Sequence, residues 1–226
     1  MPAEQTDTHA PEMPEREEQF VPAWLAALVL VLLLGVMGLG GYVVRGVVSG
    51  ESRQLDRAEE QIERWRDAVD ENPDSIEARV QLGYAYQQDG RFDRAVGEYE
   101  FVIEREPGNT AALYNLGLVY QATGVDDRAE RMFWKVLEVE PDHVLAARAL
   151  GEMYAERKQY RSLLRAVRPV VRAHPEIADL QYLTGLGYEN TGHPDWAAAR
   201  YRLALKYSPG YKKAVEGLDR LGEVIR

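Results

Sequence analysis

Residues 116–120 read Leu-Gly-Leu-Val-Tyr, and close variants of this stretch recur every 34 residues along the chain. They read Leu-Gly-Tyr-Ala-Tyr at 82–86, Leu-Gly-Glu-Met-Tyr at 150–154 and Thr-Gly-Leu-Gly-Tyr at 184–188. Prolines return at the same interval, at Pro73, Pro107, Pro141, Pro175 and Pro209. A fixed period of about 20 to 50 residues indicates a solenoid, in which each unit buries its apolar face against its neighbours.

Each unit has the apolar spacing of two helices. In the first unit, Gly83 and Tyr86 fall on one face of a leading helix. Ala95 and Tyr99 fall on one face of the helix that follows. Between the two helices, where a chain reversal favours a residue without a Cβ, stand Gly90, Gly124 and Gly192. The sequence therefore predicts antiparallel helix pairs that stack on one another.

This pattern resembles the tetratricopeptide repeat, which has a Leu-Gly pair, a Tyr three residues later, a small residue, an aromatic residue and a closing Pro. One unit supplies all of these as Leu116, Gly117, Tyr120, Ala129, Phe133 and Pro141. A later unit departs in its second helix, where Leu163 replaces the small residue and Val167 the aromatic one. The resemblance implies an all-α solenoid of about four helix-turn-helix repeats. The aromatic residues expected in its core are Tyr86, Tyr120, Tyr154, Tyr188, Phe133 and Tyr201.

The repeat register divides most of the chain. The predicted repeats are 76–109, 110–143, 144–177, which is the degenerate one, and 178–211. Residues 46–75 are predicted to form a connecting helix that is the second half of an incomplete leading repeat. Residues 212–226 are predicted to form a C-terminal capping helix with a polar outer surface.

The first part of the chain has a different composition. Residues 1–19 contain six acidic residues against one basic residue, Arg16, and are predicted to be disordered. Residues 20–45 are predicted to be a transmembrane helix, because the run from Val21 to Val44 has no charged residue. At about 1.5 Å per residue such a run spans a hydrocarbon core of about 30 Å. A cleaved secretory signal is the alternative, but the acidic leader and the length of the run favour an anchor.

Arginines near this run predict its orientation. Arg16 precedes the run, whereas four arginines follow it closely: Arg45, Arg53, Arg57 and Arg64. The positive-inside rule therefore places the repeats in the cytoplasm, on a single-pass protein of the cell membrane. The extracytoplasmic side is the alternative, since long domains cross membranes regardless of their charge.

Composition argues against several functional classes. The net charge of −10 lacks the basic footprint of general nucleic-acid binding. The chain has no cysteine, which excludes disulfides, thiolate metal sites and cysteine nucleophiles. None of the histidines, His9, His143, His174 and His193, has metal-ligand spacing from another. We therefore expect no enzyme activity, no metal and no cofactor.

A second face of each leading helix is turned about a quarter-circle from the core face. In tetratricopeptide proteins this face lines a groove that takes an extended peptide or a helix. Here it consists of Val80, Tyr84, Gln87, Tyr114, Asn115, Leu118, Gln121, Arg148, Tyr182, Leu186 and Glu189. Its tyrosines, leucines and amides have a composition typical of protein interfaces. Of the carboxylate clamp that receives chaperone tails only Asn115 is matched, so that use is not expected.

The degenerate repeat carries an unusual charge. Between residues 148 and 172 there are seven basic residues against two acidic ones, in a chain that is otherwise acidic. Four arginines spaced by four, three and four form a stripe on one helix: Arg161, Arg165, Arg168 and Arg172. The stripe is either a solvated outer face or a docking site for an acidic partner or for anionic lipid head groups.

Together these patterns predict a membrane-anchored scaffold or adaptor that holds a partner protein in the groove. We expect it to serve as an accessory or assembly factor of a membrane complex. The alternative is a purely structural subunit that docks through its transmembrane helix and arginine stripe, without a client peptide.

Overall fold

The computed structural model describes residues 57–222, which belong to the second of two compact units, Leu55–Arg226. The predicted acidic tail and the predicted transmembrane helix lie outside the described residues. Among the described residues, no helix has both the length and the apolar character needed to cross a membrane.

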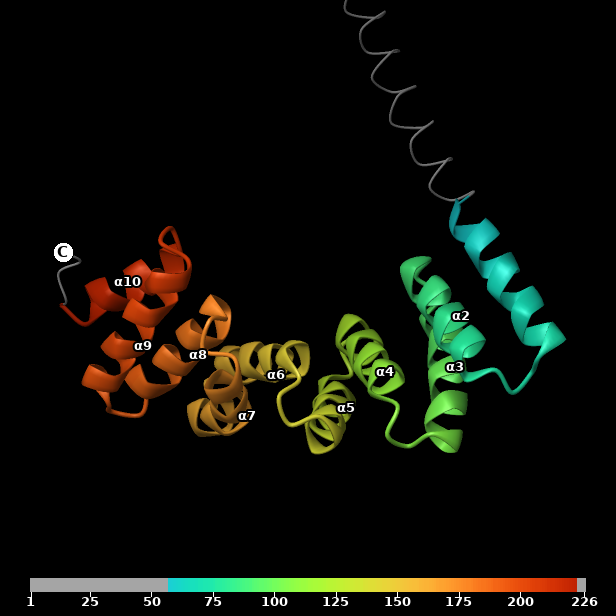
Figure 1. The fold of residues 1–226 in the computed structure, drawn as a ribbon. Coiled ribbons are helices and arrows are strands. Elements are labelled where there is room, and N and C mark those ends of the chain that lie inside the picture. Colours follow the sequence, from blue (N-terminus) through green and yellow to red (C-terminus); the bar gives the residue numbers. More distant parts are fainter. Residues whose placement is uncertain (1–56, 223–226) are drawn as a thin grey trace, which may run out of the picture. The chain divides into compact units, whose positions relative to one another are not determined.

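Residues 57–222 are helical throughout, apart from short turns, and contain no strand. A helix that includes residues 57–71 comes first. Four pairs and a final single helix follow (Figure 1): α2 (Ile76–Gln88) and α3 (Phe92–Arg105), α4 (Thr110–Ala122) and α5 (Asp126–Val139), α6 (Val144–Glu156) and α7 (Tyr160–Ala173), α8 (Ala178–Glu189) and α9 (Pro194–Tyr207), and α10 (Lys212–Arg220).

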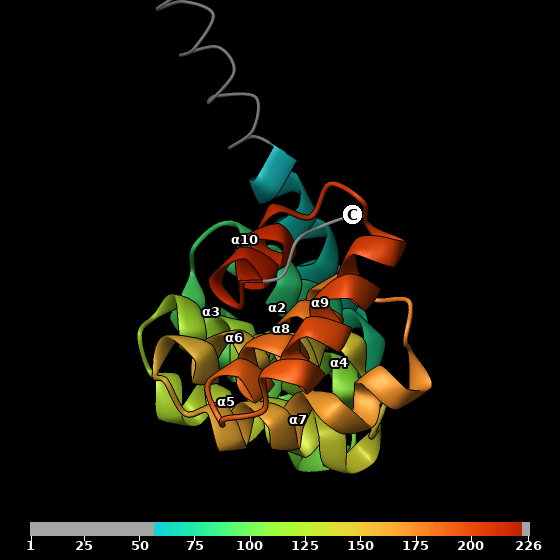
Figure 2. The ribbon, with the colours of Figure 1, turned by 90° about the vertical axis from the view of Figure 1, so that its left-hand side faces the viewer.

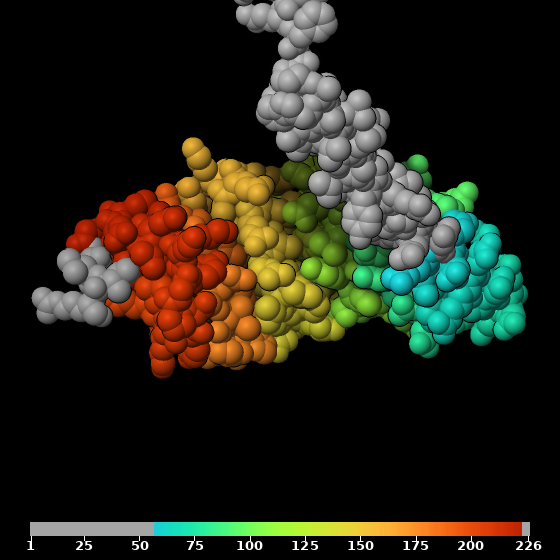
Figure 3. Space-filling model, turned by 90° about the horizontal axis from the view of Figure 1, so that it is seen from above, coloured from blue at the N-terminus to red at the C-terminus, as the bar shows by residue number. Residues whose placement is uncertain are grey.

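The pairs stack in chain order. Each helix from α2 to α10 packs against the next one, and α6 also contacts α8. Seen from the side of α10, the pairs lie one behind another (Figure 2). In the space-filling view, the surface changes from one pair to the next in the order of the sequence (Figure 3). The predicted all-α solenoid is therefore confirmed for residues 57–222.

Close contacts between a glycine and a ring hold the pairs together. A Cβ on Gly117 of α4 would lie 2.6 Å from the Phe133 ring of α5. Equivalent contacts join Gly83 to Tyr99 and Gly185 to Tyr201. In the degenerate repeat Gly151 meets Val167, and Leu183 of the next repeat supplies the volume that the missing ring would fill. Helix α7 therefore still packs between α6 and α8, although its residues depart from the pattern.

The turns inside the pairs follow the glycine pattern with one departure. Three glycines have the left-handed φ angles that the turn requires: Gly90 at 73°, Gly124 at 73° and Gly192 at 81°. At the corresponding position of the degenerate repeat, Lys158 has a φ of 55°. A side chain with a Cβ is strained in this conformation, so the turn keeps its shape here at a cost in free energy.

Helix starts also recur with the period. The first helices of three pairs begin after a residue whose side chain accepts a hydrogen bond from a backbone N–H, which satisfies one unpaired donor of the first turn. The caps are Ser75 on the Ala78 amide, Asn109 on the Ala112 amide and His143 Nδ1 on the Ala146 amide.

The six aromatic side chains predicted for the core are all buried, with exposed fractions between 0% and 7%. The core is divided near its C-terminal end. One cluster extends from Ile62 to Leu183, and the second surrounds Tyr201 and includes Leu218 of α10. Leu164 and Tyr182 touch both clusters.

Candidate functional site

The predicted groove residues lie on the first helices of the four pairs, α2, α4, α6 and α8. In Figure 1, α2, α4 and α6 lie above their partners α3, α5 and α7. We call the surface formed by the eleven predicted side chains on these first helices the inner face. Successive pairs present it in chain order, because corresponding positions recur every 34 residues.

The part of the inner face on α2 and α4 is the most open. The Tyr84 side chain is 47% exposed, and Gln121 is also exposed. Val80 and Leu118 are partly buried and pack against the core. Gln87 is held from inside, because its Oε1 accepts a hydrogen bond of 3.0 Å from the Tyr99 hydroxyl. This part therefore combines an accessible aromatic side chain with neighbours that are packed against the core or hydrogen-bonded to it.

The middle of the inner face is built around Tyr114. Its ring lies 5.7 Å from Phe133 of its own pair and 5.5 Å from His143, the residue that caps α6 of the next pair. Burial raises the pKa of the Tyr114 phenol; Arg148 of the next pair opposes this shift and Glu152 adds to it. Arg148 is paired with an acid, Asp179 of α8, at 3.5 Å. Asn115 beside Tyr114 is partly buried.

The part on α8 is engaged by the terminal helix. Tyr182 lies 5.8 Å from Tyr201 and 5.7 Å from Tyr211, which immediately precedes α10. Glu189 accepts hydrogen bonds from the Tyr201 hydroxyl and from two nitrogens of Arg220, at 2.8 and 3.0 Å. The Arg220 guanidinium thereby lowers the pKa of the Glu189 carboxyl. Leu186 between them is partly buried.

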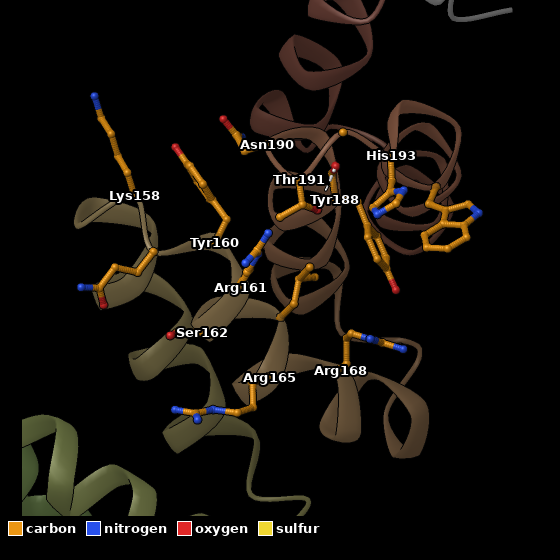
Figure 4. Close-up of a pocket in the computed structure, with 14 residues that line it drawn as sticks. Lys158, Tyr160, Arg161, Ser162, Arg165, Arg168, Tyr188, Asn190, Thr191 and His193 are labelled. Atoms are coloured by element: carbon orange, nitrogen blue, oxygen red, sulfur yellow. Dashed lines mark hydrogen bonds between the residues drawn. The ribbon is translucent and has the colours of Figure 1, made fainter.

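The arginine stripe does not lie on a flat surface. Arg161, Arg165 and Arg168 line a cleft of about 1000 Å³ between α7 and the residues that join α8 to α9, whereas Arg172 is exposed outside it. Figure 4 shows the two walls, with the labelled side chains of α7 on one and Tyr188 and His193 on the other. Arg165 leans toward the preceding pair, where its guanidinium lies 4.8 Å from the Trp134 ring.

Sequence reasoning missed the second wall of this cleft. The Trp196 side chain is 57% exposed, stacks on His193 at 4.5 Å and meets Tyr188 edge-on at 5.3 Å. The 34-residue period of the sequence contained a signal for this wall. Trp196 occupies the position of Arg94 and Arg128, whose guanidiniums each lie 5.5 Å from the tyrosine of their own pair. Tyr188 was predicted only as core and is both buried and part of the cleft.

No cluster of three or more His, Asp or Glu side chains in residues 57–222 is arranged to hold a metal ion. Every buried side-chain nitrogen and oxygen in this part of the chain has a hydrogen-bond partner. The two surfaces described above thus present aromatic, amide and cationic groups, whose chemistry suits recognition.

Comparison with known proteins agrees with this architecture. Residues 86–153 match the family model of the tetratricopeptide repeat. No curated protein sequence matches the chain. Among solved structures the fold is similar to that of MamA, with 18% identity and a TM-score of 0.61 over 72% of this chain and 95% of that one.

Two further structures have the same fold. One is YrrB, described as a tetratricopeptide protein with an unusual peptide-binding site, with 20% identity and a TM-score of 0.59 over 70% of this chain and 90% of that one. The other is pilF of Pseudomonas aeruginosa, with 20% identity and a TM-score of 0.54 over 65% and 67% of the two chains. Residues 86–153 thus carry the tetratricopeptide repeat, a repeat found in protein-interaction scaffolds, and the solved structures share the fold of this chain.

Proposed function

We propose that this protein is a membrane-anchored scaffold or adaptor that holds a peptide or helix of a partner protein on its inner face. Its role would be that of an accessory or assembly factor of a membrane complex. The observation that carries this proposal is the half-exposed Tyr84, together with the partly buried Leu118 at the equivalent position of the next pair and the exposed Gln121.

The chemistry of this face suits a peptide. Tyrosine presents a large rigid surface at small cost in side-chain entropy, and tyrosine is enriched where interfaces have their strongest contacts. Gln121 adds an amide that donates to and accepts from a peptide backbone. The similarity of the fold to YrrB, whose description names a peptide-binding site, supports the same use here.

We place the partner on the first three pairs. On the fourth pair, Tyr182 already packs against Tyr211, and Glu189 is bonded to Arg220 of α10. A partner that used these side chains would have to displace the terminal helix, whereas Tyr84 is already exposed and Tyr114 and Leu118 are only partly buried.

The anchor and its orientation belong to the same proposal. The uncharged run from Val21 to Val44 supports insertion in the cell membrane, and the arginines that follow it support a cytoplasmic position of the repeats. An anchored repeat array would concentrate its partner at the membrane, as tethering raises effective concentration.

Site-specific photo-cross-linking in native membranes tests the inner face. A cross-linking amino acid placed at Tyr84 or Leu118 of the full chain should capture one and the same partner. The matched control is Tyr207, a tyrosine of similar exposure, 41%, at the end of the second helix α9. Capture at all three positions, or at none of them, would instead favour a structural subunit without a client peptide.

The corresponding variant tests the contribution of the contacts. Replacing Tyr84 and Leu118 together by Ala should lower capture from a third inner-face position, Gln121, by about tenfold, because aromatic contacts of this type contribute roughly 1–2 kcal/mol or more. Tyr207→Ala should leave that capture unchanged. If the double variant and Tyr207→Ala captured the partner equally, Tyr84 and Leu118 would not contribute to the interface.

A further inference from the structure

The cleft beside α7 is an opening between two consecutive helix pairs. One wall is formed by the residues from Lys158 to Arg168, and the other by Tyr188, His193 and Trp196. A second hollow of about 390 Å³ continues it along α9 and shares Arg168, Tyr188 and Trp196 with it. Each hollow has the size of a ligand-binding cleft, and together they extend from the turn at Lys158 to α9.

The corresponding junction one period earlier is filled by side chains. There the Tyr154 hydroxyl donates a hydrogen bond of 2.6 Å to Glu130 and accepts one of 2.8 Å from the Trp134 indole. Arg157 closes the arrangement with a hydrogen bond of 2.9 Å to the same Glu130 carboxylate. Four side chains thus bridge the second and third pairs.

At the junction of the third and fourth pairs, three of these four positions hold a different residue, and none of the three forms the equivalent bridge. Leu164 replaces Glu130, Arg168 replaces Trp134, Thr191 replaces Arg157, and Tyr188 corresponds to Tyr154. Leu164 packs down on Gly187, where an added Cβ would lie 2.7 Å from it. The Tyr188 hydroxyl forms no hydrogen bond to any residue of 57–222. The cleft is therefore open because its bridging side chains have been replaced.

The cleft is also cationic, with Arg168 in place of a tryptophan and Leu164 in place of a glutamate. Helix α7 contains no acidic residue, and no aspartate or glutamate lines the cleft. Within the described residues, none of the cleft's four cations, Lys158, Arg161, Arg165 and Arg168, forms an ion pair. By contrast, the neighbouring Arg157 is paired with both Asp126 and Glu130. Unpaired like charges that gather in a concave site repel one another, and an anionic group relieves that repulsion.

Lys158 supplies a second, independent observation. It occupies the turn position at which the other three repeats have a glycine, and it holds the left-handed φ of 55° that disfavours a side chain. A residue that persists in a strained conformation points to a role outside the fold. Its ammonium group adds a charge at the rim of the cleft, where Figure 4 shows it beside Tyr160.

The opposite wall is aromatic. Trp196 is the most exposed of the large apolar side chains in residues 57–222, and His193 and Tyr188 hold its ring from two sides. A ligand in this cleft would therefore meet cations on one side and an aromatic surface on the other. This combination matches a protein segment in which acidic residues alternate with aliphatic or aromatic ones.

We infer that the cleft between α7, α8 and α9 is a second binding site, which takes an acidic segment of a partner protein. Carboxylates of the segment pair with Arg161, Arg168 and Lys158, and an apolar side chain of the segment lies on Trp196. A membrane surface does not fit this site. These cations line the inside of a cleft, whereas a flat bilayer contacts side chains that project from a protein surface. The site shares no residue with the inner face and stands without it.

The test uses the full chain in detergent and a short fluorescent peptide in which glutamate alternates with leucine. The peptide should bind, with an affinity that falls as salt is raised, and the same peptide with glutamine for glutamate should not bind. The double variant Arg161→Gln and Arg168→Gln should weaken binding by about tenfold, as should Trp196→Ala. The matched control is Arg131→Gln with Lys135→Gln, which removes two exposed cations of α5 outside the cleft.

Two further measurements keep the outcome decisive. Lys158→Gly introduces the glycine that the other turns have. It should weaken binding of the peptide, while the melting temperature of the protein stays the same or rises. Tyr84→Ala with Leu118→Ala should leave peptide binding unchanged, which separates this site from the inner face. The inference is overturned if the native chain does not bind the peptide, or if the variant with Arg161 and Arg168 replaced binds it equally. It is also overturned if the native chain binds vesicles of anionic lipid and not the peptide.

Discussion

The Cε1 atom of the Phe133 ring lies 2.6 Å from the point that a Cβ on Gly117 would occupy. The two helices of this pair can approach as they do only because the position has no side chain. The same relationship recurs through the array, and it makes these glycines the most constrained positions of each pair.

We expect Gly117→Leu to lower the free energy of unfolding by about 1–3 kcal/mol, because the added side chain must displace the Phe133 ring. Thermal unfolding followed by circular dichroism measures this. Gly97 provides the control, since nothing lies within 4 Å of its Cβ position in the middle of α3. Gly97→Ala should raise stability by about 0.5–1 kcal/mol. Equal effects of the two changes would contradict the packing described here.

The Lys158 turn predicts a stabilising change. Lys158→Gly should raise the free energy of unfolding by about 1 kcal/mol, because glycine adopts the left-handed conformation without strain. The reverse change, Gly124→Lys, places the same strain in a regular repeat and should lower stability by a similar amount. Urea denaturation of both variants measures the difference. A destabilised Lys158→Gly variant would mean that Lys158 contributes a contact to the fold.

The Glu189–Arg220 pair predicts a pH dependence. The pKa of the Glu189 carboxyl is lowered from 4.5 in the folded chain, so the pair stabilises the fold fully above about pH 4.5. This contribution is lost as the pH falls through the lower folded value. Because Arg220 is about half exposed, its size should be no more than about 1 kcal/mol.

The measurement compares the native chain with Glu189→Gln, which keeps an acceptor for the Tyr201 hydroxyl. The native chain should be more stable at neutral pH, and the two stability curves should converge in acid, below pH 4.5. A difference that persists unchanged in acid would show that the Arg220 contact is not electrostatic.

The proposed orientation has its own test. Protease added to intact spheroplasts should leave residues 51–226 uncut, because the four arginines that follow the uncharged run favour a cytoplasmic position of the repeats. Lysis should expose them to digestion. Complete digestion before lysis would reverse the orientation and leave the repeat fold unaffected.

The sequence predicted the helix pairs, the turns and the buried aromatic side chains well. These features depend on local rules: apolar spacing selects the buried face, and glycine marks positions of left-handed φ. Repetition strengthened each rule, since Gly90, Gly124 and Gly192 all point to the same turn. Even the departure at Val167 was visible, although the sequence did not show that Leu183 would fill the space beside it.

The inner face was predicted as a set of positions, but its accessibility was not. Spacing assigns Tyr84 and Tyr182 to the same general surface, yet Tyr84 is 47% exposed and Tyr182 packs against Tyr201 and Tyr211. The two tyrosines hold different positions of the repeat, and Tyr182 packs on Tyr201 as its equivalent Tyr114 packs on Phe133. Only the contact with Tyr211 depends on where the terminal segment lies. A helical pattern indicates which way a side chain points and carries no information about what lies opposite.

By itself, the sequence determined the repeating helix pairs and the charge of α7, because both follow from residue types at regular spacing. Only the tertiary structure decided that the arginines of α7 line a cleft. That cleft exists because Leu164 packs on Gly187 and leaves Tyr188 without a bridging partner, while Trp196 stands on the opposite wall. Whether the space between two pairs is filled depends on the length and direction of side chains from three helices, which become neighbours only when the pairs stack.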